Sequence, residues 1–331
     1  MHQELIGARR VVFFGGKGGV GKTTLASAAG WSAAENGARV LVVSTDPAHN
    51  LGHLWDRDIG QAPLLLHESG SGGSVTGVEI DPVATARHHF EAVARTVTPL
   101  MPEHLHGEVN RYFAAADASP GAHEAALMER MAQIATTRRV SEQTEPFDVV
   151  IFDTAPTGHT TRLLELPQLM STWVEGMLSR RRRSERYAAA LNALPGSEGD
   201  QDPGASRDGT IRRVLERRRE LFLRYSELLH DTEQTGFVMV ALAERMPLLE
   251  TIALHEQLRH TGVPIVGAVV NRRSPADQGD FLAARARSED EHLTWARERL
   301  PEMPLFQTGL VVEDVQSATG MARVADTFTA V

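Results

Sequence analysis

The chain has 331 residues, of which 42% are hydrophobic and 23% charged, and its formal net charge is −9. This composition is typical of a folded α/β protein, and the negative charge does not favour binding to nucleic acid. Because the sequence contains no cysteine, disulfides, zinc sites with thiolate ligands and iron–sulfur clusters are excluded.

The sequence also lacks the marks of a secreted or membrane-spanning protein. The apolar run at residues 11–14 is too short for the core of a signal peptide. No stretch approaches the roughly twenty apolar residues that cross a bilayer as a helix. We therefore expect a cytoplasmic protein.

Short apolar runs rich in Val and Ile alternate with helical patterns along the chain. The runs predict buried strands at residues 10–14, 39–43, 78–80, 148–152, 236–241 and 265–270. Apolar residues at helical spacing predict helices at 24–36, directly after a glycine-rich loop, and at 248–261. Continuous apolar strands suit a sheet covered on both faces, so we expect an α/β fold with a doubly wound, mostly parallel sheet.

Two blocks interrupt this alternation with helical patterns alone. They cover approximately residues 82–140 and 166–230. Apolar stripes in both blocks are typical of packed helices. We expect the blocks to form a helical subdomain that is inserted into a single domain spanning residues 1–331.

Other segments of the sequence are predicted to be exposed. Residues 69–77 and 194–210 are rich in Gly, Ser and Asp and read as flexible connections. The basic runs 179–186 and 212–219 are typical of solvated helix faces, with contact to acidic lipid headgroups as the alternative. The adjacent residues His88 and His89 also look exposed.

A glycine-rich loop follows the first predicted strand. Its residues are Gly16, Lys17, Gly18, Gly19, Val20, Gly21, Lys22, Thr23 and Thr24, and they satisfy the pattern G-x-x-x-x-G-K-[ST]. Glycines let the backbone N–H groups curl around phosphate oxygens, and the N-terminus of the next helix adds positive potential. The pattern predicts a P-loop in which Lys22 reaches the β- and γ-phosphates of a nucleotide and the Thr23 hydroxyl binds Mg²⁺.

Two other predicted strands lead to acidic residues. Asp46 follows the strand at 39–43, at the edge of the sheet where ligands bind in open α/β folds. It is either a turn residue before Pro47 or an acid that positions the attacking water. Asp153 follows the strand at 148–152 and has the form of a Walker B acid, acting on Mg²⁺ directly or through water. A plain strand end is the alternative for Asp153, and the P-loop favours the functional interpretation.

Further motifs extend this pattern. A second lysine in the P-loop, Lys17, marks the deviant Walker A group of P-loop ATPases. The stretches STDPAHNLG at 44–52, FDTAPTGHT at 152–160 and PGAHEA at 120–125 accompany it. Together these motifs resemble those of the arsenite-pump ATPase (ArsA) family, which includes the ATPase that targets tail-anchored membrane proteins.

The resemblance implies a Mg²⁺-dependent ATPase that acts as a homodimer, with two ATP molecules between its subunits. In such an enzyme Lys17 points across the interface to the partner's nucleotide, while Lys22 acts within its own subunit. By the same resemblance, Asp46 orients the attacking water and Asp153 begins the second switch segment. Asn271, near the end of a predicted strand, would hydrogen-bond the adenine.

The resemblance leaves three biological roles open. The first is capture and release of a partner, with targeting or chaperoning of membrane-protein segments by the helical subdomain. The second is the energising subunit of an arsenite-type anion pump, and the third is a positioning or regulatory switch like the MinD and ParA ATPases. The lack of cysteine argues against arsenite sensing through thiolates and against the zinc site at the targeting ATPase's dimer seam. We expect no zinc and no nucleic-acid partner.

Overall fold

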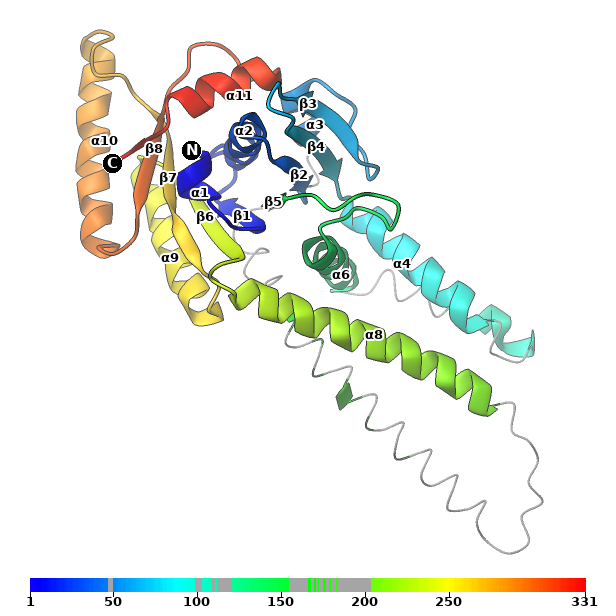
Figure 1. Ribbon diagram of the computed structural model, residues 1–331. Helices are drawn as coiled ribbons and strands as arrows, with labels where there is room; N and C mark the ends of the chain where they lie inside the picture. Colours follow the sequence, from blue (N-terminus) through cyan, green and yellow to red (C-terminus); the bar gives the residue numbers. More distant parts are fainter. Residues whose placement is uncertain are drawn as a thin grey trace, which may run out of the picture.

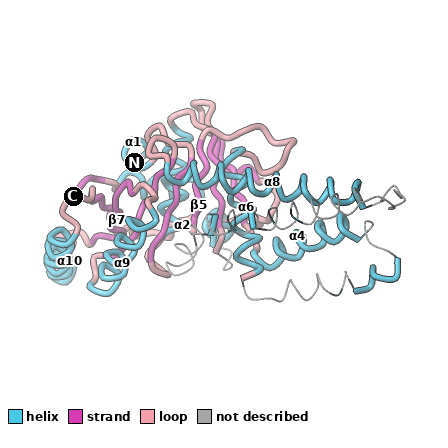
Figure 2. The backbone as a smooth tube through the Cα atoms, turned by 90° about the horizontal axis from the view of Figure 1, so that it is seen from below, coloured by secondary structure: helices cyan, strands magenta, loops and turns pink. Residues whose placement is uncertain are grey.

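The computed structural model describes residues 1–46, 50–98, 103–108, 111, 121–154, 166–167, 170, 172, 175–176, 179, 183 and 204–331. In these residues a central sheet carries helices on both faces (Figures 1 and 2). The strands are β1 (Val11–Gly16), β2 (Arg39–Ser44), β3 (Leu64–Glu68), β4 (Ser74–Glu79), β5 (Val149–Asp153), β6 (Thr235–Leu242), β7 (Ile265–Arg273), β8 (Leu305–Gly309) and β9 (Thr329–Ala330). The helices are α1 (His2–Leu5), α2 (Lys22–Glu35), α3 (Asn50–Trp55), α4 (Pro82–Val97), the 3₁₀ turn η2 (Glu103–Leu105), α6 (Ala122–Thr137), α8 (Gly204–His230), α9 (Arg245–Thr261), α10 (Asp280–Arg299) and α11 (Ser317–Asp326).

The sheet is mostly parallel, as the sequence predicts. Its strand order is β3-β4-β2-β5-β1-β6-β7-β8-β9. The pairs from β4 through to β8 are parallel, while β3 and β9 pair antiparallel at the two edges. Because β1 lies between β5 and β6, the loop after β1 leaves the middle of the carboxyl edge, where sheets of this kind bind ligands.

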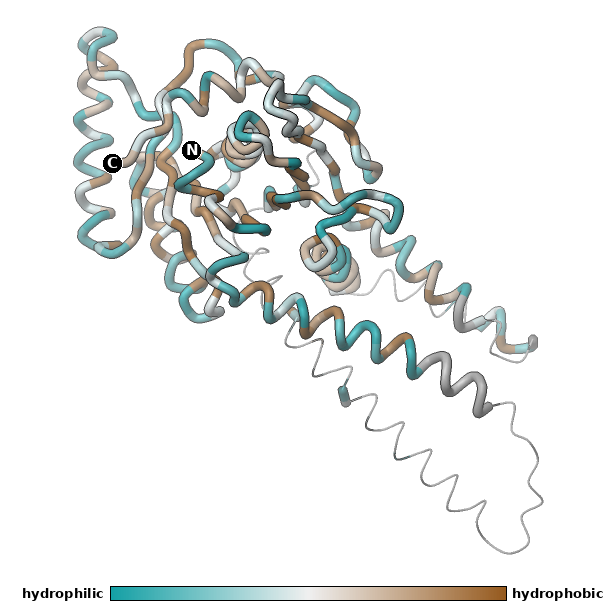
Figure 3. The backbone as a smooth tube through the Cα atoms, in the orientation of Figure 1, coloured by the Kyte–Doolittle hydropathy of each residue, from teal (hydrophilic) through white to brown (hydrophobic). Residues whose placement is uncertain are grey.

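Side chains of β1 alternate between two hydrophobic clusters, one on each face of the sheet. The ring of Phe13 stacks on that of Phe152, with centroids 5.1 Å apart, on the face covered by α6, α8 and α9. Phe14 packs on the opposite face with Leu25 of α2 and Met321 of α11. This double burial explains why the strands read as continuous apolar runs. In Figure 3 brown gathers along the central strands, whereas α10 at the edge is mostly teal and white.

Strand register brings three loops to the same level. Phe14 of β1 lies opposite Asp153 of β5, and Ser44 of β2 lies opposite the same residue from the other side. The segments that follow β1, β2 and β5 therefore begin side by side. These segments hold the P-loop, Asp46 and the start of the second switch motif.

Three helices of the predicted helical blocks lie beside one another, and two of them, α4 and α8, extend away from the sheet (Figure 1). α4 packs on α6, and α6 packs on α8 (Figures 1 and 2). Of the apolar stripes in the first block, the one on α6 is buried, because Leu127, Met131 and Ile134 belong to the hydrophobic core. The limits of the helical subdomain, and its insertion into a single domain, stay predictions, since much of residues 166–203 lies outside the described part.

The flexible connection predicted at residues 69–77 is wrong. β3 and β4 form an antiparallel hairpin, and only residues 69–73 lie between them. β4 also pairs with β2 and buries Val75 and Val78. Most of the Gly and Ser residues of this segment thus lie in a tight turn, and their presence in the sequence obscures the short strand that follows. The edge strands β3, β8 and β9 also escape prediction, because their burial patterns are partial or absent.

The second predicted connection, residues 194–210, is corrected in part. α8 begins at Gly204, so residues 204–210 are helical, while 194–203 lie outside the described residues. In that part of the chain which the structure describes, no helix is both long and apolar enough to cross a membrane.

Candidate functional site

The P-loop joins the end of β1 to the start of α2. Gly16 has φ 153°, and a Cβ atom there would lie 2.3 Å from the carbonyl oxygen of Val240 on β6. Gly21 has φ 93°, and a Cβ atom there would lie 2.2 Å from Nδ2 of Asn271. Both positions therefore require glycine, because the backbone is left-handed and a neighbouring group leaves no space for a side chain.

Lys22 is the first residue of α2, and its side chain is buried in the loop. Its Nζ donates a hydrogen bond to the carbonyl oxygen of Lys17 at 3.0 Å. Burial lowers the pKa of Lys22, and the charges of Asp153 and Asp46 partly offset that effect. The ammonium group thus lies inside the loop, where phosphate oxygens of a nucleotide would meet it.

Asp153 ends β5, and its carboxyl group is buried behind the loop. Its Oδ2 accepts hydrogen bonds from Thr23 Oγ1 at 2.6 Å and from Ser44 Oγ at 3.5 Å. Its Oδ1 is buried and has no hydrogen-bond partner among the described residues. Desolvation raises the pKa of Asp153 to about 6, against the opposing effects of Thr23 and Lys22.

The donor atoms around Asp153 fit Mg²⁺. A buried carboxylate oxygen without a partner is costly, and a cation beside it would remove that cost. The Thr23 hydroxyl and the Asp153 carboxylate are hard oxygen donors, held together by their hydrogen bond. Mg²⁺ commonly binds through one or two such protein groups together with substrate phosphates and water.

A cavity of about 500 Å³ lies at the P-loop. The sequence-predicted residues that line it are Gly18, Gly19, Gly21, Lys22, Thr23, Thr24 and Asp46. Asp46 accepts a hydrogen bond at Oδ2 from Nδ2 of Asn50, the first residue of α3, at 3.3 Å. Its backbone N–H donates to Ser44 Oγ at 3.4 Å. The carboxylate is thereby held at the cavity, as an acid that orients water requires.

Lys17 differs from Lys22, since it is not among the described residues that line this cavity. Its Nζ instead forms an ion pair with Glu250 Oε1 of α9 at 2.8 Å. The two side chains are 39% and 35% exposed. Exposed pairs of this kind contribute about 0.2–1 kcal/mol, so Lys17 can leave Glu250 at small cost. The two loop lysines therefore point to different places.

Asn271 lies near the end of β7 and supports the P-loop directly. Its Nδ2 donates to the carbonyl oxygen of Val20 at 2.9 Å, and its Oδ1 accepts from Thr308 Oγ1 at 2.8 Å. It also lines a second cavity of about 260 Å³, whose apolar walls are Leu242, Ala243, Phe281, Leu282 and Leu310. Because Oδ1 also accepts from the Arg272 N–H, the group left for an adenine is the second N–H of the amide, which can donate to a ring nitrogen.

Comparison with known proteins identifies the family of the chain. The family model described as anion-transporting ATPase matches residues 9–330. The chain belongs to this family of ATPases. It is 31% identical over 296 residues to the arsenical pump-driving ATPase of Acidiphilium multivorum. The aligned region covers 88% of this chain and 45% of that protein. It therefore spans less than half of that relative.

Two other relatives are covered over most of their length. The chain is 29% identical over 335 residues to ATPase GET3B of Arabidopsis thaliana, across 96% of this chain and 78% of that protein. It is also 29% identical over 285 residues to the putative arsenical pump-driving ATPase 2 of Aquifex aeolicus, across 86% and 87% of the two chains.

For this member of the ATPase family, the structure brings most predicted site residues together. Most of the loop and Asp46 line one cavity, Asp153 lies behind it on the Thr23 hydroxyl, and Asn271 lies at the adjoining cavity. Pro47, His49 and residues 155–165 of the two switch motifs lie outside the described residues. The roles predicted for the site residues stay predictions.

Sequence reasoning missed several residues at this site, including four polar ones that lie outside every motif. Arg272, Asp314 and Gln316 line the P-loop cavity, and Glu250 pairs with Lys17. Arg272 has φ 58°, which is left-handed for a residue with a side chain, and such backbone strain gathers at functional sites. No motif marks any of the four. The position of Arg272 directly after Asn271 was the one available signal.

We predict that Asp153→Asn raises the melting temperature of the nucleotide-free, metal-free protein at pH 8. The folded pKa of about 6 exceeds the usual 3.8, so the stabilisation by this carboxyl is complete below about pH 4 and is lost as pH rises through 6. The cost at pH 8 is on the order of 3 kcal/mol. Asparagine keeps an acceptor for Thr23 without the charge.

Thermal melts of both proteins between pH 4.5 and pH 8 test this prediction. The difference in melting temperature should shrink as the pH falls, because wild-type Asp153 then becomes neutral. A difference that does not change with pH would contradict a raised pKa.

Proposed function

We propose that the chain hydrolyses ATP as a homodimer that holds two nucleotides, with Mg²⁺, between its subunits. The observation that carries the proposal is the divergence of the two loop lysines. Lys22 lies within its own loop, while Lys17 reaches outward to α9. A cation that lies beside the phosphate cavity without lining it is suited to a nucleotide bound by another subunit.

Exposed apolar side chains near the same edge of the sheet support a partner subunit. Met246 and Leu249 lie in the first turns of α9, directly after β6. Phe281 begins α10, and Leu310 and Val312 follow β8. Met246 is 60% exposed and Phe281 is 78% exposed. Large apolar groups that gather around a binding site are typical of a surface that another protein covers.

In the proposed reaction a water molecule attacks the γ-phosphate. Asp46 orients that water from the end of β2, and Lys22 meets the charge that develops on the transferred group. Lys17 of the partner subunit adds a second ammonium group at the transition state. Bound Mg²⁺, held by Thr23 and Asp153, would neutralise phosphate charge.

We propose further that dimer closure and opening drive the capture and release of a partner that carries an apolar membrane-protein segment, in the cytoplasm. The relative named ATPase GET3B, matched over 96% of this chain, supports a relation to that branch of the family. The relatives named arsenical pump-driving ATPases favour a second candidate, the energising of an anion pump. The lack of cysteine weighs against arsenite as its trigger.

Lys17→Ala is expected to lower ATP turnover by about 10³-fold or more, as loss of a finger-type cation does, with little effect on ATP affinity. Lys22→Ala serves as the matched control, because it should weaken nucleotide binding itself. Steady-state hydrolysis and equilibrium binding of a labelled nucleotide separate the two effects.

A mixing experiment tests whether Lys17 acts across the interface. Lys17→Ala and Asp46→Asn chains, each inactive alone, are mixed before ATP is added. A mixed dimer contains one site with an intact Asp46 and a Lys17 from its partner, so random pairing should restore about a quarter of wild-type turnover. If Lys17 acts within its own subunit, the mixture stays inactive.

Asp46→Asn is expected to trap the ATP-bound, closed dimer, because the water is no longer oriented while all phosphate contacts remain. Light scattering with ATP should give the mass of two chains. Mass spectrometry of proteins that copurify with the trapped dimer then distinguishes the roles: proteins with an exposed apolar segment support targeting, and a channel protein supports the pump. A monomer in saturating ATP would contradict the dimer mechanism.

Glu250→Gln is expected to promote closure, since Lys17 would no longer have a resting partner in its own chain. The strength of an exposed ion pair predicts that the ATP concentration for half-maximal dimer formation falls about two- to five-fold. Glu256→Gln, an exposed position farther along α9, is the control. Tighter ATP binding by monomers, with dimerisation unchanged, would argue against this role.

The two lysines also allow dimer closure to be followed directly by NMR. Lys17 and Lys22 are the only lysines among the 34 basic residues, so ¹³C-lysine labelling gives one NMR signal set for each. The Lys17 signal of wild type should shift when ATP closes the dimer, because its Nζ leaves the carboxylate of Glu250 for phosphate oxygens of the partner's nucleotide.

A further inference from the structure

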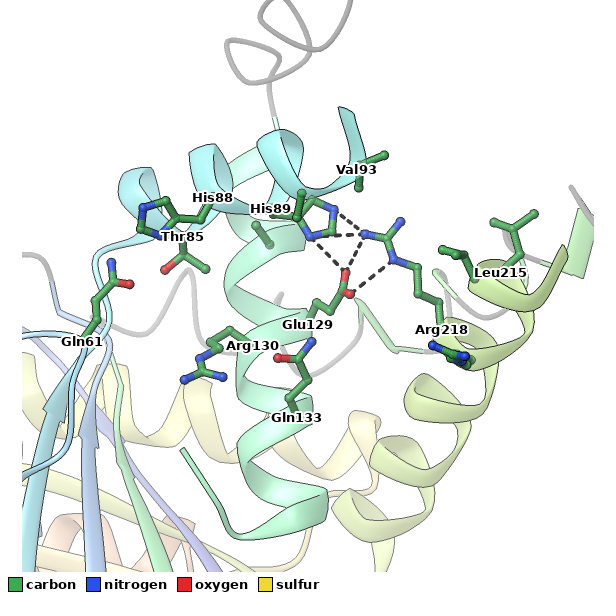
Figure 4. A pocket seen from close by; sticks show the side chains of 14 residues that line it. Gln61, Thr85, His88, His89, Val93, Glu129, Arg130, Gln133, Leu215 and Arg218 are labelled. Carbon is green, nitrogen blue, oxygen red and sulfur yellow. Dashed lines mark hydrogen bonds and ion pairs between the residues drawn. The ribbon is translucent and has the colours of Figure 1, made fainter. Parts of the chain in front are cut away.

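A separate cavity of about 630 Å³ lies among α4, α6 and α8 (Figure 4). It shares no lining residue with the two cavities of the nucleotide site. Its polar lining residues are Gln61, Thr85, His88, His89, Glu129, Arg130, Gln133, Arg217 and Arg218, and its apolar ones are Ala92, Val93, Ala126, Val214 and Leu215. A volume of this size holds a small organic molecule.

One wall of this cavity is an ionic cluster that joins the three helices. Arg218 of α8 donates to both carboxylate oxygens of Glu129 on α6, at 3.2 and 3.0 Å. The ring of His89 on α4 contacts Arg218 and lies 3.6 Å from Glu129. The predictions that His89 is exposed and that Arg218 belongs to a solvated face are therefore wrong. Because Glu129 neutralises Arg218, this cluster offers no free charge.

Arg130 of α6 also lines the cavity, and it is half-buried. Its Nη2 donates one hydrogen bond, to the carbonyl oxygen of Val140 at 2.8 Å. No carboxylate among the described residues pairs with it, and burial lowers its pKa. In Figure 4 its guanidinium group points away from the Glu129–Arg218 pair. A desolvated guanidinium without an acid is costly, and a bound anion would remove that cost.

The remaining lining groups define the rest of the ligand. Thr85, Gln61 and Gln133 provide neutral hydrogen-bond donors. Val93, Leu215 and Ala126 provide apolar surface. Arg217 is exposed, so solvent screens its charge. One desolvated cation between neutral donors and apolar walls matches a singly charged head on an apolar body.

We propose that this cavity binds a small organic carboxylate, with its head on Arg130 and its body against the apolar walls. A carboxylate matches the fork of a guanidinium group and carries one charge at neutral pH. The proposal does not rest on the ATPase mechanism, because it uses no residue of the nucleotide site.

Calorimetric titration of the full chain with straight-chain carboxylates from acetate to decanoate tests the proposal. We expect saturable binding of one ligand per chain that strengthens with chain length as apolar surface is buried. Octanol, which lacks the charge, and inorganic phosphate, which lacks the apolar body, should each bind at least ten-fold more weakly than octanoate.

Variants then locate the site. Arg130→Gln should weaken octanoate binding about ten-fold or more, the effect of losing a charged hydrogen bond, while Arg130→Lys, which keeps the charge but loses the fork, should give an affinity between those of wild type and Arg130→Gln. Arg139→Gln, at a half-buried arginine just beyond the same helix that does not line the cavity, should leave octanoate affinity unchanged. ATP affinity, measured in each variant, should also be unchanged and reports that the protein is folded.

Three results would overturn the proposal. They are no saturable binding of any carboxylate in the series, equal octanoate affinity in wild type and Arg130→Gln, and tighter binding of octyl phosphate or octylamine than of octanoate.

Discussion

The hydrogen bond from Thr23 to Asp153 connects residues that are 130 positions apart, and the nucleotide site depends on it. It forms because β1, β2 and β5 end at the same level, so the first helical turn after the P-loop meets the end of β5. Burial makes the bond matter. Asp153 loses hydration and keeps one oxygen without a described partner, and the group that satisfies the other oxygen is the hydroxyl suited to a metal. The sheet thus places the buried carboxylate of Asp153 beside a loop suited to phosphates. A cation bound there would offset the free-energy cost of burying this charge.

The use of lysine in the chain follows from the same geometry. The other 32 basic residues are arginine, and both lysines lie in the P-loop. A guanidinium group is planar and presents a rigid fork, whereas an ammonium group is compact and sits on a flexible stem. Lys22 must fit inside a loop that already encloses its Nζ, so a compact head is required. Lys17 has open space, and its stem lets it rest on Glu250 and still move away. The compact head group therefore explains why residue 22 is a lysine, and the flexible stem explains why residue 17 is one.

The sequence allowed the centre of the sheet and the P-loop to be predicted, because both depend on local patterns. An apolar strand and the glycine spacing of a P-loop can be recognised from consecutive residues, without knowledge of the residues that surround them in space. The hairpin of β3 and β4 could not be predicted, since Gly and Ser in its turn conceal strand residues that are buried by pairing with β2. His89, Arg218 and Glu250 could not be placed for a related reason. Each looks like a surface residue in its own helix, and its partner comes from a different helix or loop. Contacts between elements distant in sequence carry no local signal.

The helical block and the nucleotide site share no cavity, yet the chain connects them by short paths. α6 leads to β5, which ends at Asp153, and α8 leads to β6, which pairs with β1. The two strands that flank the P-loop strand are therefore continuations of two helices that surround the cavity of Arg130. An ionic cluster already fixes α4, α6 and α8 to one another, so these helices are constrained to move together. A change in the spacing of these helices would have to reach β5 across residues 138–148 and β6 across residues 231–234, so these two strands are the direct route by which the helical block could affect the nucleotide site.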